Sequence, residues 1–272
     1  MDILWSIELG VEDIFQPSCT CNFFYYNDYL YYSFSTVNKD IITSKGRCGE
    51  SLFTYKINPV SGEYTKYLYD FSNDGKILLS DEWHYFIDNG LIIYIGKYLR
   101  ILEDKIILEN TYPKNIMHKN LSHEYIFDEI IIKYNGEKKL YCINKSNGKE
   151  LWNITLIGYL YTEIEYKDGN IIFGTSGMGS VLYTIELESG IIKRNDNNAR
   201  ASRYSWYNDT IILPDKKGNI QIVNPYANET IDNYKIKNGK LTDYSPIKIY
   251  ENKIFTIAFN NKNRGKIVCI KI

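Results

Sequence analysis

The 272-residue chain lacks several features that would assign it to a familiar functional class. No run of apolar residues approaches the roughly 18 that a transmembrane helix needs. The first residues, Met-Asp-Ile-Leu-Trp-Ser, show no basic segment, apolar core or small-residue cleavage site of a signal peptide. The net charge is −1, and acidic and basic residues are interspersed. We therefore expect no membrane insertion and no binding to nucleic acid or to an anionic membrane surface.

Cysteine and histidine are scarce, with five and three residues. An odd number of irregularly spaced cysteines favours reduced thiols over a disulfide framework, so we predict a cytoplasmic protein, unless a leader was removed from a longer form. Cys19, Cys21 and Cys48 could approach one another and hold a metal ion, but they lack the Cys-x-x-Cys spacing of zinc knuckles. His118 and His123 also match no metal-binding motif. We expect no metal and no cofactor.

Tyrosine is abundant, with 26 residues, and together with many isoleucines it favours β-strands. A turn rich in Asn, Asp or Gly recurs along the chain, each time before a strongly β-forming run, as in β-hairpins. These turns lie at residues 27–28, 88–90, 128–129, 168–170, 208–209 and 251–252. Their usual spacing of roughly 40 residues is the period of a four-stranded propeller blade. The first interval is longer because it contains Thr36–Glu50, which we expect to be a polar insertion.

A second kind of turn falls between the third and fourth strands of each predicted blade. The turns of this kind are Asn58–Glu63, Glu103–Asp104, Asn144–Lys149, Glu188–Gly190 and Asn224–Asn228. The gap between Ile272 and Met1 supplies the sixth. The sequence therefore predicts an all-β fold in a single domain, residues 1–272, which forms a six-bladed β-propeller of four-stranded antiparallel blades.

The first nine residues resemble an internal segment that would be the last strand of a blade. Met1–Leu9 and Gly148–Leu156 agree at four positions, and Lys266–Lys271 resembles Lys139–Asn144, which precedes the internal copy. The identical pairs are Leu4 and Leu151, Trp5 and Trp152, Ile7 and Ile154, and Leu9 and Leu156. We predict that the N-terminal strand completes the C-terminal blade and closes the ring, which removes exposed sheet edges. The two tryptophans should then occupy equivalent buried sites in two blades.

The segment Lys139–Trp152, KLYCINKSNGKELW, resembles the repeat of the PQQ-like (quinoprotein-type) β-propellers, including the outer-membrane assembly scaffolds. In that repeat a strand ending near Asn is followed by a Gly-Lys-x-x-Trp turn and strand. Gly179–Gly190 and Gly218–Asn224 show weaker similarity. The resemblance implies a propeller architecture, but such propellers serve both as enzymes and as scaffolds. PQQ-dependent dehydrogenases resemble larger, exported rings that hold calcium, and no motif matching theirs can be placed here.

Alignment of the first strand of each blade predicts polar side chains around a central channel. They are His84, Glu124, Glu163, Glu165, Arg203 and Lys248. Such a ring could bind a polar ligand at the channel mouth, or its groups could pair among themselves and with water. A calcium-dependent hydrolase would need carboxylates from several blades at one point. The two basic residues of the ring would compete with calcium for those carboxylates.

Long loops are expected to gather on one face of the propeller, where recognition usually takes place. They are residues 10–20, 36–50, 71–81, 112–120, 195–202 and 235–243. In or beside these loops lie Arg47, Trp83, Arg200 and Tyr244, which are of types common in interfaces. We therefore predict a monomeric, non-catalytic scaffold or an inhibitor or immunity-type protein that binds another protein. The alternative is a calcium-dependent hydrolase or a small-ligand sensor with its site at the channel.

Overall fold

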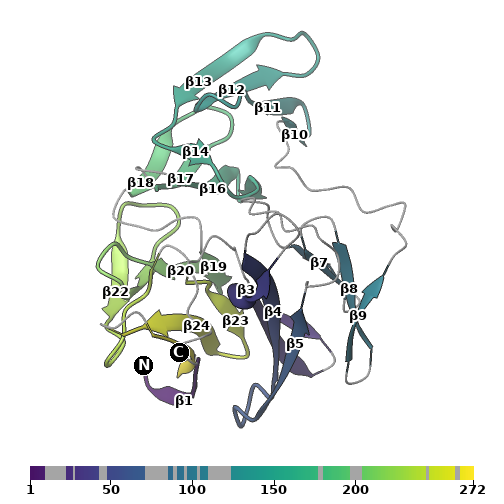
Figure 1. Ribbon diagram of the computed structural model, residues 1–272. Helices are drawn as coiled ribbons and strands as arrows, with labels where there is room; N and C mark the ends of the chain where they lie inside the picture. The colour runs from purple at the N-terminus through teal and green to yellow at the C-terminus, as the bar shows by residue number, and fades with distance from the viewer. Residues whose placement is uncertain are drawn as a thin grey trace. The chain divides into compact units, whose positions relative to one another are not determined.

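The computed structural model describes residues 1–9, 23–26, 28–42, 48–70, 85–87, 91–94, 97–102, 105–109, 124–176, 180–196, 204–242, 245–260 and 264–272. Within these ranges every regular element is a β-strand, so the all-β prediction is confirmed (Figure 1). None of the described residues forms a helix with the length and hydropathy to cross a bilayer. The chain divides into two compact units, Met1–Ile116 with Tyr244–Ile272, and Met117–Asp243.

The first unit contains three four-stranded antiparallel sheets among its described residues. The first sheet consists of β2 (Phe23–Tyr26), β3 (Tyr29–Ile42), β4 (Cys48–Ile57) and β5 (Tyr64–Asp70). The second consists of β6 (Tyr85–Ile87), β7 (Leu91–Tyr94), β8 (Lys97–Leu102) and β9 (Lys105–Glu109). The last sheet has the order β23 (Lys248–Tyr250), β24 (Lys253–Phe259), β25 (Gly265–Lys271) and β1 (Ile3–Glu8).

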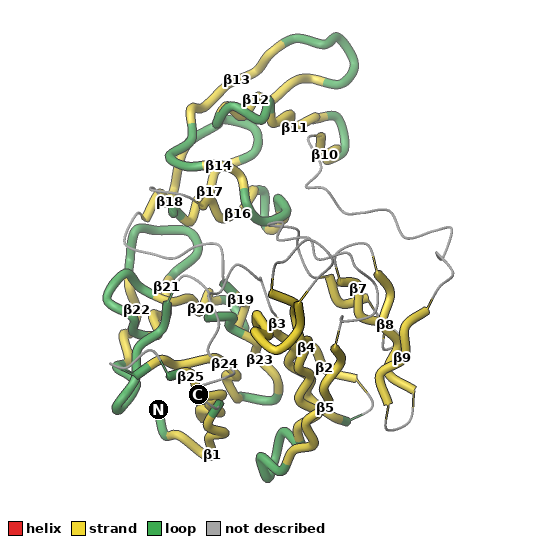
Figure 2. Tube along the Cα trace, viewed as in Figure 1, coloured by secondary structure: helices red, strands yellow, loops and turns green. Residues whose placement is uncertain are grey.

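The second unit contains three further antiparallel sheets, drawn as strands in Figure 2. The third sheet of the chain consists of β10 (Glu124–Phe127), β11 (Ile130–Tyr134), β12 (Lys139–Asn144) and β13 (Glu150–Thr155). The fourth contains β14 (Tyr159–Leu160), β15 (Glu165–Lys167), β16 (Asn170–Ser176), β17 (Leu182–Glu186) and β18 (Ile192–Asp196), and both β14 and β15 pair with β16. The fifth consists of β19 (Ser205–Tyr207), β20 (Thr210–Pro214), β21 (Ile220–Val223) and β22 (Thr230–Tyr234).

Where the predicted hairpin turns fall within the described residues, they lie between the two strands of a hairpin, as the sequence predicts. The turn predicted at residues 88–90 lies outside the described residues. Asp28, Asp128, Asp168 and Asn208 have φ angles between 49° and 64°, a region that Asn and Asp tolerate better than most residues. Glu251 has a φ of 45° and is an exception in residue type. The turn chemistry therefore accounts for most of the register of these hairpins.

The turns between the third and fourth strands depend on an asparagine side chain. The Oδ1 atom of Asn58 accepts hydrogen bonds from the backbone N–H groups of Val60 and Ser61, at 2.9 and 3.1 Å. Asn144 binds the second and third residues after it in the same way, at 3.0 and 3.2 Å. Asn is favoured at the first position of such turns because its short side chain can imitate a backbone carbonyl.

The predicted insertion in the first sheet is wrong in its greater part. Strands β3 and β4 continue through Thr36–Glu50 on both sides of residues 43–47, which lie outside the described residues. Thr36 pairs with Ser51, and Val37 pairs with Glu50. The β-branched residues Thr36, Val37 and Ile42 favour an extended backbone, so polar composition alone was a poor guide to a loop here.

The N-terminal strand pairs with the last strand of the chain. β1 runs antiparallel to β25, from the pair Ile3 and Ile270 to the pair Glu8 and Lys266. In the same unit, the last sheet packs against the first through a common core that contains Ile7, Phe255 and Phe23. The first and last segments of the sequence are therefore joined both by backbone hydrogen bonds and by apolar packing.

The cores of the second unit lie between the faces of consecutive sheets. Ile132 and Leu140 of the third sheet share one core with Phe173 of the fourth. On the opposite face of the fourth sheet, Ile172 packs with Ile211 of the fifth. Adjacent residues of β16 thus enter two different cores, because successive side chains of a strand point to opposite faces.

Candidate functional site

A tryptophan joins the third sheet to the turn of the fourth. Trp152 of β13 donates a hydrogen bond from Nε1 to the carbonyl oxygen of Leu187 at 2.9 Å. Its ring lies so close to Gly190 that a Cβ atom there would be only 2.6 Å from the ring. Cys142, which pairs with Trp152 across the sheet, donates from Sγ to the same carbonyl at 3.8 Å. One carbonyl and one glycine of the next sheet thus form the binding site for the indole.

The same arrangement joins the last sheet to the first. Trp5 of β1 donates from Nε1 to the carbonyl oxygen of Pro59 at 3.3 Å, and a Cβ atom on Gly62 would lie 2.7 Å from its ring. Trp5 pairs with Cys269, as Trp152 pairs with Cys142. The prediction that the two tryptophans occupy equivalent sites is confirmed, although both are half-buried rather than fully buried.

Replacement of Gly190 by alanine should destabilise the protein much more than replacement of Gly148. Both glycines have positive φ, 73° and 68°, so each substitution costs about 1–2 kcal/mol of backbone strain. Only at Gly190 would the new methyl group overlap an indole ring, since nothing lies within 4 Å of a Cβ atom at Gly148. Overpacking of this kind adds about 1–3 kcal/mol. Urea unfolding measures both values, and equal losses for the two variants would contradict the contact.

An arginine takes the place of tryptophan between the fourth and fifth sheets. Arg194 lies in β18 and pairs with Thr184, in the register that Trp152 and Cys142 have in the third sheet. Its side chain is fully buried, and its Nη2 atom lies 2.6 Å from Oδ2 of Asp196. Burial lowers the pKa of Arg194, and Asp196 acts to raise it. The guanidinium remains charged because its ordinary pKa is above 12.

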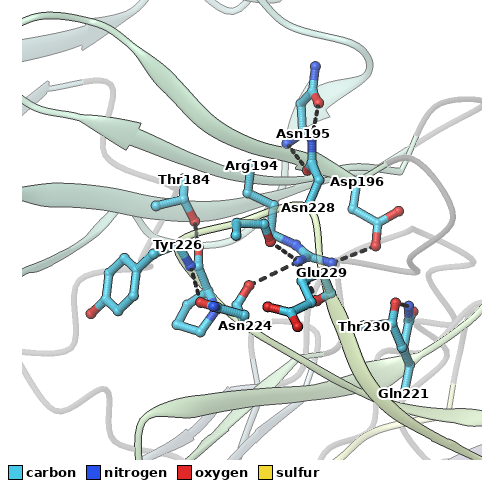
Figure 3. A network of polar contacts seen from close by, with 12 residues as sticks. Thr184, Arg194, Asn195, Asp196, Gln221, Asn224, Tyr226, Asn228, Glu229 and Thr230 are labelled. Atoms are coloured by element: carbon cyan, nitrogen blue, oxygen red, sulfur yellow. Dashed lines mark hydrogen bonds and ion pairs between the residues drawn. The ribbon is translucent and has the colours of Figure 1, made fainter.

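Figure 3 shows how the turn of the fifth sheet surrounds this guanidinium. Nη1 of Arg194 donates to the carbonyl oxygens of Asn224, at 2.9 Å, of Glu229, at 3.1 Å, and of Ala227. The hydroxyl of Thr184 donates to the carbonyl oxygen of Pro225 at 2.5 Å, as the Cys142 thiol does to Leu187. A planar group with several donors can bind several carbonyls at once, which an indole with one N–H cannot do.

Glu163 is the first of the predicted channel residues that the structure brings to a neighbouring sheet. The hydroxyl of Tyr125, in β10, donates to Oε2 of Glu163 at 2.8 Å. Burial raises the pKa of Tyr125, and the adjacent carboxylate raises it further. The phenol therefore stays protonated and acts as a donor, and the pair links the third sheet to the entry of the fourth.

Glu165 makes an equivalent link from the fourth sheet to the fifth. Its Oε1 atom accepts from the hydroxyl of Tyr204 at 2.7 Å, and its Oε2 atom accepts from Nε1 of Trp206 at 2.6 Å. Burial raises the pKa of Tyr204 well above its usual value, and Glu165 contributes to the rise. Lys167 lies 4.5 Å above the Trp206 ring and 3.5 Å from Asp209. Both carboxylate oxygens of Glu165 are thus engaged by neutral donors.

Glu124 and Lys248 occupy different surroundings from these two carboxylates. Glu124 forms an ion pair with Lys133 at 3.6 Å. Because it precedes Tyr125 in β10, it points away from the face on which Tyr125 meets Glu163. Counted from the hairpin turn, Tyr125 and not Glu124 holds the position in the third sheet that Glu165 holds in the fourth. The prediction that Glu124 and Glu165 occupy equivalent positions is therefore wrong by one residue. Lys248 is half-buried at the start of β23, in the other unit, opposite Phe255.

The remaining predicted residues lie outside the residues whose structure is described. They are His84, Arg203, Arg47, Trp83, Arg200 and Tyr244, together with Cys19 and Cys21. Cys48 is the first residue of β4. Cys142 and Cys269 are buried free thiols, and burial raises the pKa of each to about 11. Within the described ranges, no three His, Cys, Asp or Glu residues are placed to hold a metal ion.

The sequence analysis did not identify Arg194, nor the tyrosines that bind Glu163 and Glu165. Arg194 could have been found, because it follows Gly190 by four residues as Trp152 follows Gly148. Tyr125 and Tyr204 carried no such signal. They lie beside the predicted channel residues in the sequence, and only the side-chain direction in each strand makes them partners of the glutamates.

Antiparallel sheets repeat along the sequence. Within each unit, an outer strand contacts a turn of another sheet between the third and fourth, the fourth and fifth, and the last and first sheets. This arrangement is typical of repeat proteins of the β-propeller class. The family described as outer membrane protein assembly factor BamB matches residues 120–272, more than half of the chain. The chain belongs to this family. The resemblance to PQQ-like repeats that the sequence showed in Lys139–Trp152 is thereby confirmed.

Comparison with curated proteins gives no match. Among solved structures, the chain is similar to BamB from Moraxella catarrhalis, with 10% identity, 100% of this chain and 99% of that chain covered, and a TM-score of 0.41. It is also similar to the computationally designed protein Ika8, with 7% identity, 93% and 71% covered, and a TM-score of 0.38. The designed protein Ika4 is similar with 8% identity, 53% of this chain and 87% of that chain covered, and a TM-score of 0.34.

Proposed function

We propose that the protein is a non-catalytic scaffold that binds another protein through the loop-rich face of a six-bladed propeller. Its six sheets would be the blades, and the pairing of β1 with β25 would complete the last of them. The packing of the last sheet against the first supports this arrangement, since a ring requires that contact. The two Trp–Gly contacts and Arg194 support it further, because each joins one sheet to the next in the same register.

The observation that carries the functional proposal is the use of the inner-strand carboxylates. Glu163 is bound by Tyr125, and Glu165 by Tyr204 and Trp206, so both stabilise contacts between sheets. A calcium-dependent hydrolase would need such groups to converge on one ion. Recognition is then left to the loops, which rigid scaffolds commonly use for binding.

The binding face is tested by recovery of a partner on tagged full-length protein from the lysate of its own host. We expect one protein in stoichiometric amount, and at least tenfold less of it when Arg47, Trp83, Arg200 and Tyr244 are changed to alanine. The matched control changes Val60 and Tyr64 to serine, two side chains 70% and 50% exposed at an outer turn. Equal losses for both variants would overturn the assignment of binding to the loop face. A bound metal without any protein partner would favour the channel ligand or hydrolase alternative.

The proposed scaffold could act in the cytosol or at the outer membrane, and its cellular location distinguishes these two forms of the proposal. The buried free thiols Cys142 and Cys269 suit the cytosol, where we propose that the protein acts, with an inhibitor or immunity role as one form. The family description instead names outer membrane protein assembly. Fractionation of cells, with alkylation of thiols before lysis, decides between them. A periplasmic fraction would overturn the cytosolic location and leave the scaffold proposal intact.

A further inference from the structure

The N-terminal strand occupies a groove that is built from distant parts of the sequence. Ile7 and Leu9 are 4% and 6% exposed, and with Trp5 they form a row of alternate side chains on the buried face of β1. The ring of Trp5 lies 5.8 Å from that of Phe255 and rests on Gly62. On the opposite face, Leu4 is 46% exposed. The contact that buries β1 thus depends on three side chains.

The backbone of the groove is the edge of β25. Its pairing with β1 covers the strand from Ile3 to Glu8. Beyond that ladder, the N–H of Leu9 donates to the carbonyl oxygen of Gly265 at 3.0 Å, and the N–H of Lys271 donates to that of Asp2 at 2.9 Å. Any extended segment with the same alternation of side chains could form these main-chain bonds.

The protein contains a second example of the same recognition. Residues 151–156 repeat Leu-Trp-x-Ile-x-Leu, and Trp152 is bound by a carbonyl and a glycine in the way that Trp5 is. That copy lies in mid-chain, between β12 and β14, whereas β1 begins at residue 3. The groove on β25 therefore differs from its internal counterpart, because its occupant β1 is separated along the sequence from β25 by all the other described strands.

We propose that the edge of β25, together with the turn at residues 58–62, is a strand-accepting groove that takes the N-terminal strand of a second copy of this chain in place of β1. The groove contacts the same atoms whichever copy supplies the strand. The chain's own strand has an effective concentration on the order of millimolar, so it fills the groove in dilute solution. Exchange between copies follows at higher concentration or when β1 is weakened. This inference goes beyond the proposed function and does not depend on it.

The groove is tested on the full chain with a fluorescent peptide of residues 1–9. The variant Trp5→Ala weakens the resident strand but leaves the acceptor unchanged, so it should bind the peptide about a hundredfold more tightly than the wild type. The matched control Trp152→Ala lacks the equivalent tryptophan at the internal copy and should bind no better than the wild type. A peptide with alanine in place of its tryptophan should lose the gain.

Fluorescence anisotropy measures the Kd of the peptide. Equal Kd values for the wild type, Trp5→Ala and Trp152→Ala would overturn the proposal. Equal Kd values of Trp5→Ala for the peptide with tryptophan and the peptide with alanine would overturn it too. If Trp5→Ala does not fold, Leu9→Ala weakens the same strand and serves in its place. In the folded variant, the peptide should also raise the Tm, and it should leave the Tm of the Trp152→Ala control unchanged.

Exchange between whole chains is tested with the double variant Glu8→Cys and Lys266→Cys, whose two positions pair across β1 and β25. Unlabelled and ¹⁵N-labelled protein are mixed near millimolar concentration, oxidised and digested. Disulfide-linked peptides with one light and one heavy half, increasing with concentration, are expected. Only unmixed pairs at every concentration would overturn the exchange.

Discussion

A chain that begins at residue 10 is expected to lose about 5 kcal/mol or more of its free energy of unfolding. The deletion removes Ile7, Leu9 and Trp5 from the core between the last sheet and the first, and each apolar side chain contributes about 1.5–3 kcal/mol. It also leaves the edge of β25 without a backbone partner, which favours aggregation. The expected loss is comparable with the whole stability of a marginal domain.

Urea unfolding and size-exclusion chromatography of the truncated and intact proteins measure this effect. The matched control keeps the strand and changes Ile3 and Leu4 to serine. These side chains are 39% and 46% exposed, so their loss should cost only about 0.5 kcal/mol each. A truncated protein that remains monomeric and unfolds at the same urea concentration as the intact protein would show that the N-terminal strand does not hold the sheets together.

Arg194→Ala is the substitution with the largest expected effect in the second unit, about 3–5 kcal/mol. It would leave the carboxylate of Asp196 without its cation and would remove one donor from three carbonyl oxygens of the next turn, of which those of Ala227 and Glu229 keep a backbone donor. A buried group that loses its partner loses more free energy than the original bond contributed. Arg194→Lys should recover only part of the loss, because an ammonium group cannot reach several carbonyls in one plane.

The neighbouring Lys193 provides the control for this experiment. Its surface ion pair with Glu186, at 3.2 Å, should contribute less than about 1 kcal/mol. In Arg194→Met the carboxylate of Asp196 loses its cation, whereas Arg194→Met with Asp196→Asn also removes that negative charge. The double variant should therefore lose less free energy of unfolding than Arg194→Met alone. Urea unfolding of the four Arg194 variants and of the control Lys193→Ala measures these differences. A loss below about 1 kcal/mol for Arg194→Ala would mean that the guanidinium contacts are not retained in solution.

The candidate site was only partly accessible from the sequence. Glu163 and Glu165 were identified as inner-strand residues, since they lie a fixed distance before a recognisable turn. Their partners were not, because Tyr125 and Tyr204 meet them across sheets and a shift of one residue reverses the face of a side chain. An error of one residue in the predicted register also placed Glu124 on the wrong face of its strand, where it forms an ion pair with Lys133.

The sequence by itself determined most of the strands, the turns that the structure describes, and the N-terminal segment as the strand that pairs with the end of the chain. Each of these depends on local chemistry: Asp and Asn at positive φ, Asn side chains that cap turns, and a repeated Leu-Trp-x-Ile-x-Leu pattern. Only the tertiary structure decided which carbonyl groups Arg194 binds and that Glu163 and Glu165 join neighbouring sheets. Those contacts are made between sheets, where the distance and direction of two backbones, and not the type of residue, select the partner.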